Sequence, residues 1–311
     1  MKIFISGGCK NGKSSFAQKL AFNLAQKNGG NPVYFATMIP HDEEDEERIR
    51  RHRDERAGLN FDTIEVKNDF SQVAESLEEG RVILLDSLTA LLAAQIFEGR
   101  GDFSPSAIED AAAKALEEIQ SAVRNLMKKS DSVIFVSDEI YNDGKYDELT
   151  EIYKKSLARL EQLVAGECDK IYELSTGFEE DFENVASPET NSALILGGAF
   201  QGKTRFAKRM FSLSDDDIFI CTEESPPDFS KTCISHYENY VAWCLKNNLP
   251  PMTNFSGSKK KIIICDDIFC GIVPTDSFQR KLREETGKAL QQIAKDMSLW
   301  RVFCGIGRRL R

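Results

Sequence analysis

The feature that most constrains the fold of this chain is a glycine-rich loop close to its first residue. Positions 7–14 read Gly-Gly-Cys-Lys-Asn-Gly-Lys-Ser and match the pattern Gly-x-x-x-x-Gly-Lys-Ser/Thr. The strand-like run Ile3–Ser6 comes before the loop, and the Ala- and Leu-rich stretch Ser15–Lys27 follows it. A strand, a glycine loop and a helix in this order form a P-loop, and an ordinary glycine turn before a helix is the alternative. We therefore predict an α/β domain that begins with a phosphate-binding loop.

Each part of this loop has a predicted role in binding a nucleoside triphosphate. Backbone N–H groups and the helix N-terminus are expected to surround the phosphates. The residues of this set are Gly7, Gly8, Cys9, Lys10, Asn11, Gly12, Lys13 and Ser14. Lys13 is expected to reach the β- and γ-phosphates, and the hydroxyl of Ser14 to bind Mg²⁺. The loop thus predicts Mg²⁺ as the cofactor and ATP or GTP as the nucleotide.

The same combination occurs a second time along the chain. The run Ala193–Leu196 leads into Gly197–Thr204, which is also a full match to the loop pattern. Its candidate phosphate-binding residues are Gly197, Gly202, Lys203 and Thr204. A repeat changes the expected number of domains. We predict two tandem P-loop domains at residues 1–175 and 191–311, joined by a polar linker at 176–190.

The distribution of apolar runs predicts the fold class. Strand-like runs at 3–6, 33–36, 82–85, 133–137 and 171–174 alternate with helical patterns. This alternation is typical of a mostly parallel sheet flanked by helices, here a RecA-like P-loop NTPase. Between Thr222 and Lys261 the second copy has no counterpart to the charged segment near residue 50 or to the run at 82–85. We expect a degenerate second copy, whose loop can bind phosphate but does not catalyse independently.

Two carboxylates at strand ends are candidates for the reaction site. Asp86 ends the run Val82–Leu85, where Mg²⁺ needs a second protein ligand, although an Asp there can also cap the following helix. Glu139 follows the run at 133–137 and is a candidate for positioning a hydroxyl or a metal-bound water. We predict Ser14 and Asp86 as metal ligands and Glu139 as a catalytic residue.

The segment His41–Arg56 is unusually rich in charge. Acidic residues precede basic ones, so the segment favours a helix with a solvated face and weak ion pairs. By spacing alone, His52 within it is most simply a surface histidine.

Composition excludes several other functions. A formal net charge of −10 argues against a non-specific nucleic-acid partner. No stretch approaches the roughly 20 apolar residues of a membrane span. The 8 cysteines form no Cys-x-x-Cys pair, so neither a zinc site nor a disulfide framework is indicated. We expect a cytoplasmic protein with reduced thiols.

Taken together, the motifs of the first copy resemble a known enzyme family, the bifunctional adenosylcobinamide kinase/adenosylcobinamide-phosphate guanylyltransferases of cobalamin biosynthesis. The matching elements, in the family's order, are Gly7-Gly8-x-x-x-Gly12-Lys13-Ser14, Tyr34-Phe35-Ala36-Thr37, Arg48-Ile49-x-x-His52-Arg53, Arg56, Thr63-x-Glu65 and Leu85-Asp86-Ser87-Leu88-Thr89. The C-terminal family motif is divided: the first copy keeps Asp138-Glu139-Ile140, and the second copy has Gly271-Ile272-Val273-Pro274. The second half therefore resembles a shortened family copy.

The resemblance implies a function in two steps. A nucleoside triphosphate phosphorylates the aminopropanol hydroxyl of adenosylcobinamide, and His52 then takes GMP from GTP and passes it to the phosphorylated corrinoid. Arg48 and Arg53 are positioned in sequence to neutralise the attacked phosphate, and imidazole is a good nucleophile near neutral pH. Because the family assembles as symmetric oligomers, the resemblance also implies a homo-oligomer or a pairing of the two copies within one chain.

Two other functions stay open at this point. The chain is alternatively a P-loop small-molecule kinase that lacks guanylyl transfer, or a non-catalytic, nucleotide-binding regulatory protein. The loss of motifs from each copy is the observation that keeps both alternatives open.

Overall fold

The chain divides into two units. The computed structural model describes residues 1–8, 11–40, 42–66, 69–141, 146–175, 178–181, 192–255, 260–268, 274 and 276–310, with backbone only at 44, 45, 48, 51, 52, 55, 175 and 178–181. Unit 1 comprises Met1–Ile140 and Tyr146–Phe182, and unit 2 comprises Tyr141–Lys145 and Glu183–Arg311. The predicted domain limits of 1–175 and 191–311 stay a prediction.

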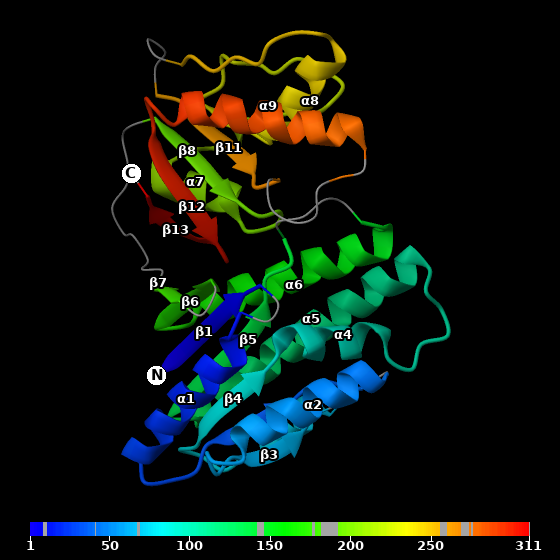
Figure 1. Cartoon of the computed structure of the whole chain (residues 1–311), viewed down its shortest axis with the longest axis vertical. Helices are drawn as coiled ribbons and strands as arrows, with labels where there is room; N and C mark the ends of the chain where they lie inside the picture. Colours follow the sequence, from blue (N-terminus) through cyan, green and yellow to red (C-terminus); the bar gives the residue numbers. More distant parts are fainter. Residues whose placement is uncertain are drawn as a thin grey trace. The chain divides into compact units, whose positions relative to one another are not determined.

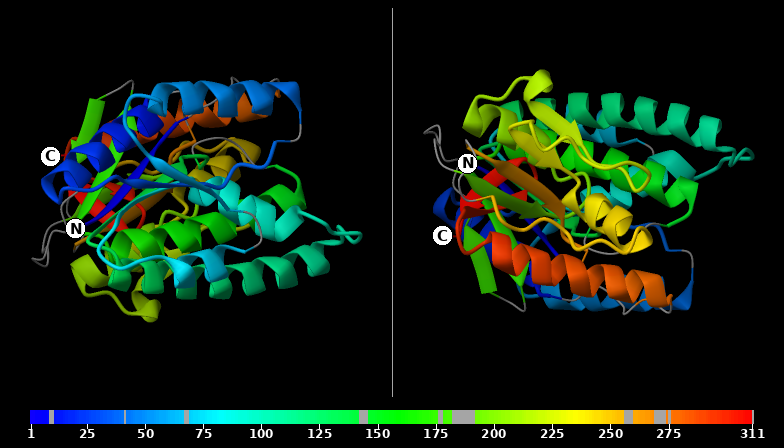
Figure 2. Two further views of the ribbon diagram at one scale, coloured as in Figure 1. Left: turned by 90° about the horizontal axis from the view of Figure 1, so that it is seen from below. Right: turned by 90° about the horizontal axis from the view of Figure 1, so that it is seen from above.

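Unit 1 is a seven-stranded sheet with helices on both faces (Figures 1 and 2). Its strand order is β3-β2-β4-β5-β1-β6-β7, and all neighbours are parallel except β6 and β7. The strands are β1 (Lys2–Gly7), β2 (Val33–Ala36), β3 (Asp62–Glu65), β4 (Val82–Asp86), β5 (Ser132–Asp138), β6 (Lys170–Ser175) and β7 (Phe178–Asp181). The helices are α1 (Lys13–Lys27), α2 (Glu43–Arg56), α3 (Phe70–Ser76), α4 (Leu88–Phe97), α5 (Pro105–Lys129) and α6 (Glu148–Gly166).

Burial on both faces explains why the central strands read as continuous apolar runs. Ile3, Phe4 and Ile5 of β1 are fully buried, because α1 packs toward one face of the sheet and α4, α5 and α6 cover the other. The carboxyl ends of β1, β5 and β4 lie at the same edge, since these strands are parallel neighbours. In this register Gly7 is paired with Asp138. The sheet therefore brings the end of the glycine loop's strand beside a carboxylate.

Unit 2 contains a six-stranded sheet of related order. The order is β13-β12-β8-β11-β10-β9, in which only β13 is antiparallel to its neighbour. The strands are β8 (Ala193–Gly197), β9 (Ile218–Ile220), β10 (Cys233–Ser235), β11 (Ile262–Asp266), β12 (Ser298–Phe303) and β13 (Ile306–Arg309). The helices are α7 (Lys203–Phe211), α8 (Tyr237–Lys246) and α9 (Ser277–Ile293), and one 3-10 turn spans Asp215–Asp217. Apolar side chains of α7 pack in one core cluster with Trp300, whereas those of α8 and α9 pack in another with Ile263.

The predicted fold class is confirmed: the described residues form P-loop α/β units with mostly parallel sheets. The strand predictions at 3–6, 33–36, 82–85, 133–137 and 171–174 are confirmed as β1, β2, β4, β5 and β6. None of the helices that the structure describes is both long enough and apolar enough to cross a membrane.

Two details of the sequence prediction were wrong. The segment 176–190 was expected to be a linker, but residues 178–181 form β7, which extends the sheet beside β6. The second copy was expected to lack a counterpart of the strand at 82–85, but β10 occupies that place between β9 and β11. With three residues and a sequence of Cys-Ile-Ser, β10 is too short to show a strand pattern. The other part of that prediction is confirmed, because residues 221–232 contain no helix like α2.

Candidate active site at the first glycine loop

The glycine loop of unit 1 depends on glycine at two positions. Gly12 has a φ of 92°, in the left-handed region, and precedes the first turn of α1. At Gly7 a Cβ atom would lie 2.3 Å from the carbonyl oxygen of Leu174, so a side chain has no room there. The side-chain amide of Asn11 donates a hydrogen bond to the same carbonyl. These contacts hold the loop against the end of β6.

Lys13 is held by oxygen atoms of its own unit. Its Nζ lies 2.9 Å from Oδ1 of Asp138 and donates to the carbonyl oxygen of Gly8 at 2.7 Å. The lysine side chain is almost fully buried, whereas the carboxylate is about one quarter exposed (24%). Thr89 orients the end of β5, because its hydroxyl accepts a hydrogen bond of 2.8 Å from the backbone N–H of Asp138. The ammonium group of Lys13 therefore lies next to the glycine loop, in contact with the carboxylate of Asp138.

Asp86 is oriented by a tyrosine and an arginine. The hydroxyl of Tyr34 donates to Oδ2 of Asp86 at 3.0 Å. The guanidinium carbon of Arg56 lies 3.6 Å from the centroid of the Tyr34 ring, which is a cation–π contact, and Arg56 is buried. Next to Asp86, the hydroxyl of Thr37 accepts from the N–H of Ser87 at 2.7 Å. The position of this carboxylate is therefore set by groups from β2 and α2.

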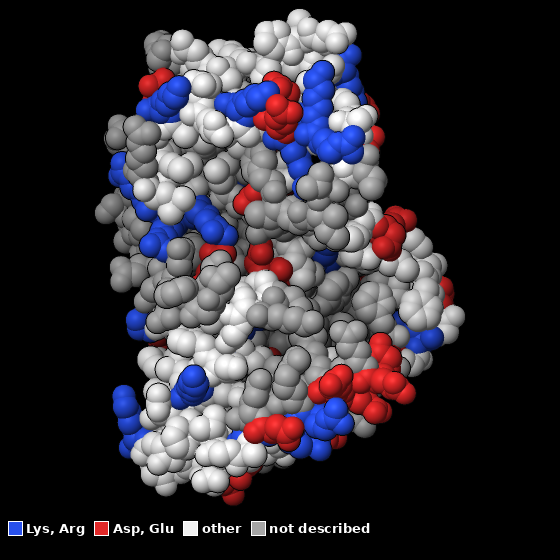
Figure 3. All heavy atoms as spheres, in the orientation of Figure 1, with Lys and Arg blue, Asp and Glu red and all other residues white. Residues whose placement is uncertain are grey.

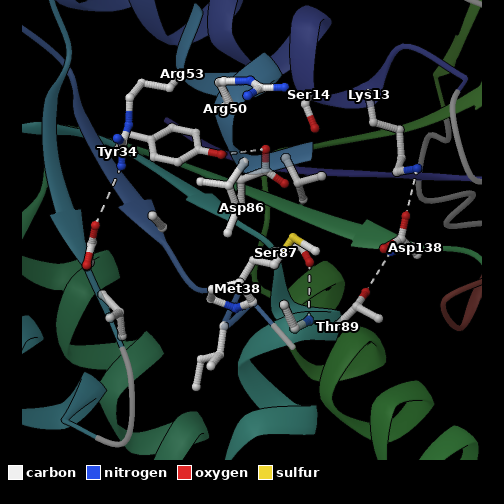
Figure 4. A pocket seen from close by; sticks show the side chains of 18 of the residues that line it. Lys13, Ser14, Tyr34, Met38, Arg50, Arg53, Asp86, Ser87, Thr89 and Asp138 are labelled. Atoms are coloured by element: carbon white, nitrogen blue, oxygen red, sulfur yellow. Dashed lines mark hydrogen bonds and ion pairs between the residues drawn. The ribbon is translucent and has the colours of Figure 1, made fainter. Parts of the chain in front are cut away.

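A cavity of about 1460 Å³ joins these elements. Its lining includes Lys13, Ser14, Asp86 and Asp138, which Figure 4 labels. This volume exceeds the roughly 300–1,000 Å³ of ordinary ligand pockets, so the cavity has room for more than a nucleotide. Helix α2 forms one wall through residues spaced along one face: Glu43, Glu46, Glu47, Ile49, Arg50, Arg53 and Arg56.

The wall formed by α2 is charged and mostly exposed. Arg50 lies 3.7 Å from Glu47, and Arg53 lies 3.8 Å from Glu65 of β3. Figure 3 shows acidic and basic side chains next to one another where α2 reaches the surface. Exposed pairs of this kind contribute little to stability, so their arginines are available to an anionic ligand at small cost.

The cavity lining also includes Tyr153 of α6. Its hydroxyl donates to the carbonyl oxygen of Thr89 at 2.9 Å. Burial raises the pKa of this phenol far above its ordinary value, and the nearby carboxylates of Glu161 and Asp138 raise it further. Tyr153 is therefore a neutral hydrogen-bond donor at any physiological pH.

The structure brings together part of the set expected from the sequence. Lys13, Ser14, Asp86 and Arg53 all line the cavity. Cys9 and Lys10 lie outside the described residues, as do the side chains of Arg48 and His52, whose backbone belongs to α2. The roles of all these residues stay predictions.

Sequence reasoning missed one acidic residue. Asp138, and not Glu139, lines the cavity and contacts Lys13. The backbone N–H of Glu139 donates to the carbonyl oxygen of Gly7, and its catalytic role stays a prediction. Two adjacent carboxylates at the end of a strand were the available signal, but successive residues of a strand point to opposite sides.

The donor set at the first loop suits Mg²⁺. The side chains of Ser14 and Asp86 point into the same part of the cavity (Figure 4), and both offer the hard oxygen ligands that Mg²⁺ prefers. Magnesium usually keeps several waters and binds phosphate oxygens besides one or two protein groups. A hydroxyl, a carboxylate and an open cavity meet that requirement.

The loop of unit 2 repeats the lysine arrangement. Lys203 Nζ lies 2.7 Å from Oδ1 of Asp266 and 2.6 Å from the carbonyl oxygen of Gly198, and Gly202 has a φ of 78°. The register of the two sheets makes Asp266 the counterpart of Asp138.

The counterpart of Asp86 in unit 2 is a serine. By the same register, Ser235 occupies that position, and His236 follows it. His236 is the N-cap of α8, with a φ of 57°. The second loop thus keeps its lysine and loses the carboxylate that unit 1 places across from Ser14.

Residues 3–181 match the model of a family described as cobinamide kinase / cobinamide phosphate guanyltransferase. No curated protein matches the chain. Among solved structures, the ATPase domain of G40P is similar over 56% of this chain and 69% of its own, with 12% identity and a TM-score of 0.32. The flagellar accessory protein FlaH from Methanocaldococcus jannaschii is similar over 58% of this chain and 75% of its own, with 14% identity and a TM-score of 0.27.

Proposed function

The chain belongs to the cobinamide kinase / cobinamide phosphate guanyltransferase family, and from this membership we propose which residues perform each step of its reaction. It is an enzyme of cobalamin biosynthesis, a transferase with kinase and nucleotidyltransferase activity that uses nucleotides. The observation that carries the proposal is the cavity at the first loop, whose lining combines Lys13 and Asp86 with the arginines of α2.

The kinase step takes place at the first glycine loop. Residues 7–14 hold the triphosphate of ATP or GTP, and Lys13 leaves Asp138 to bind the β- and γ-phosphates. Ser14 and Asp86 hold Mg²⁺, which neutralises the charge of the phosphate oxygens when it is bound. The aminopropanol hydroxyl of adenosylcobinamide attacks the γ-phosphorus, and the nucleoside diphosphate leaves.

The proton of that hydroxyl needs an acceptor. Glu139 was the candidate from the sequence, and the contact of Asp138 with Lys13 supports Asp138 instead. Once Lys13 moves to the phosphates, the carboxylate of Asp138 is free to take the proton. General bases of this kind act from within hydrogen-bond distance of the proton that they remove.

The guanylyl step uses His52 on α2. The imidazole attacks the α-phosphorus of GTP, a nitrogen–phosphorus bond forms, and pyrophosphate leaves. A phosphate oxygen of the phosphorylated corrinoid then attacks the same phosphorus, which releases the histidine and yields adenosyl-GDP-cobinamide. Arg48 and Arg53 neutralise the charge that develops on the phosphate. The presence of Arg50, Arg53 and Arg56 in the cavity wall supports a phosphate site along α2.

The second copy contributes a second phosphate-binding loop and the motif Gly271–Pro274. Of this motif, residues 271–273 lie outside the described part of the chain. We propose that Lys203 and Thr204 bind phosphate and that this motif completes the first site, either within one chain or in a homo-oligomer. If a truncated chain ending near Thr190 stays folded and fully active, the second copy is not needed for the reaction and this proposal is refuted.

Labelling with GTP that carries ³²P in its α-phosphate tests the guanylyl step. We expect acid-labile, alkali-stable label on the wild-type chain, no label on His52→Ala, and transfer of the label to phosphorylated cobinamide. Kinase activity without any label would identify a kinase that lacks guanylyl transfer. Nucleotide binding with neither label nor turnover would identify a regulatory protein, and either result would overturn the assignment of His52.

A further inference from the structure

Three potential metal ligands meet at the carboxyl edge of the unit 2 sheet. His236 and Glu238 lie at the start of α8, directly after β10, and Asp266 ends the neighbouring strand β11. His236 Nδ1 lies 2.8 Å from Oε1 of Glu238 and 3.9 Å from Oδ1 of Asp266. One donor atom from each residue falls within 4.8 Å of the others. In parallel α/β sheets, ligands bind outside this edge.

The three side chains are held in place by other contacts. Glu238 is buried, and its second oxygen accepts a hydrogen bond of 2.9 Å from the backbone N–H of Asp266. His236 adopts a left-handed backbone conformation, which is uncommon for a residue with a side chain. Its ring is partly exposed, so solvent and ions can reach the cluster. A rigid set of donors open to solvent on one side is suited to binding an ion.

A cation already occupies part of this cluster. The ammonium group of Lys203 contacts Asp266 at 2.7 Å, and Lys203 is the lysine of the second glycine loop. If that lysine turns to a bound phosphate, the carboxylates of Asp266 and Glu238 lose its positive charge. Two neighbouring carboxylates repel each other, and a bound cation would relieve this repulsion.

We propose that unit 2 binds a divalent transition-metal cation, of the Zn²⁺ or Co²⁺ type, through Nδ1 of His236, Oε1 of Glu238 and Oδ1 of Asp266. One imidazole with two carboxylates favours these metals over Mg²⁺, which prefers oxygen ligands. The site therefore differs in kind from the oxygen set at Ser14 and Asp86 in unit 1. It does not depend on the proposed function, because its residues lie beyond the family match at 3–181.

Cobalt titration of the full-length chain, freed of metal with a chelator, tests the proposal. We expect one Co²⁺ site with the visible absorption of a low-coordinate N/O complex, displaced by Zn²⁺. His236→Asn and Glu238→Gln each alter a direct ligand and should bind Co²⁺ at least about 10- to 100-fold more weakly, which is the usual loss for a group that only orients a ligand. The chain has 3 histidines, so His41→Ala and His52→Ala serve as matched controls that keep the site. Equal binding by His236→Asn and the wild type would overturn the proposal.

A variant that binds Co²⁺ more tightly distinguishes loss of a ligand from loss of the folded structure. Asn tolerates the left-handed conformation at position 236, so His236→Asn is expected to unfold thermally like the wild type. Lys203→Met removes the competing ammonium group and should bind Co²⁺ about five- to tenfold more tightly. Unchanged affinity in Lys203→Met would contradict binding through Asp266. A misfolded variant cannot produce the expected gain.

Discussion

The ammonium nitrogen of Lys13, the first residue of α1, lies 2.9 Å from a carboxylate oxygen of Asp138, which ends the strand β5. The same relationship joins Lys203 to Asp266 at 2.7 Å in unit 2. In both units the carbonyl oxygen of the second loop glycine accepts from the same ammonium group. In each unit an acid and a carbonyl oxygen thus hold the loop lysine, and we expect a bound triphosphate to replace these contacts.

Replacement of Lys13 by Ala tests this loop directly. We expect kcat/KM of the kinase step to fall by about 10²- to 10³-fold, because the lysine stabilises charge that develops on the transferred phosphate. Measurement of corrinoid phosphorylation checks the result. Lys19, an exposed lysine on the same helix, provides the control Lys19→Ala. Wild-type kinase activity in Lys13→Ala would contradict the assignment of the reaction to the first loop.

Replacement of Tyr34 by Phe tests the orientation of Asp86. The change removes the hydroxyl that donates to the carboxylate at 3.0 Å and leaves the ring in place. Loss of such an orienting group typically weakens metal binding by about 10- to 100-fold. The Mg²⁺ concentration for half-maximal kinase activity should therefore rise by about tenfold or more. Tyr172→Phe, which alters a tyrosine outside the cavity lining, should leave it unchanged, and an equal Mg²⁺ requirement in both variants would argue against Asp86 as a ligand.

Arg56 and Arg53 are expected to differ in their contributions to stability. Arg56 is buried over the ring of Tyr34, so Arg56→Ala should lower the free energy of unfolding of unit 1 by about 1–3 kcal/mol. The side chain of Arg53 is 68% exposed, and Arg53→Ala should change stability by less than about 1 kcal/mol. Urea unfolding measures both values. Arg53→Ala is nevertheless expected to slow transfer of the α-labelled GMP group, and equal effects of both changes on stability would refute the distinction.

The reactivity of two cysteines should depend strongly on pH. Burial raises the pKa of Cys221 and of Cys233 to about 12 each. Since the thiolate is the reactive form, only about 10⁻⁴ of each thiol is ionised at pH 8, and about 100-fold more at pH 10. Iodoacetamide labelling, followed by mass spectrometry of the peptides, should show this increase in the folded chain. Labelling at pH 8 as fast as in urea would show that these thiols are not buried.

Much of the fold could be predicted because a buried parallel strand can be recognised from its amino-acid sequence. A strand covered on both faces needs apolar residues at every position, so runs such as Val82–Leu85 are visible without any structure. Strand β10, at Cys233–Ser235, was missed because three residues carry no measurable pattern. Strand β7 was missed because its sequence Phe-Glu-Glu-Asp is mostly polar and shows no apolar run. A strand at the edge of a sheet can be polar, since it has a neighbouring strand on one side only.

The sequence by itself determined the chemistry of the first loop. A phosphate-binding loop needs a glycine that permits a positive φ, a lysine and a hydroxyl at fixed spacing, and this local pattern does not depend on the rest of the fold. Only the tertiary structure decided which acids accompany them. Asp138 rather than Glu139 contacts Lys13 because the register of β1 and β5 pairs Gly7 with Asp138, and successive residues along a strand point to opposite sides. Likewise, the order of strands in the second sheet brings His236 beside Asp266, although 29 residues separate them in the chain. Local spacing specifies a loop, whereas strand register and strand order specify its partners.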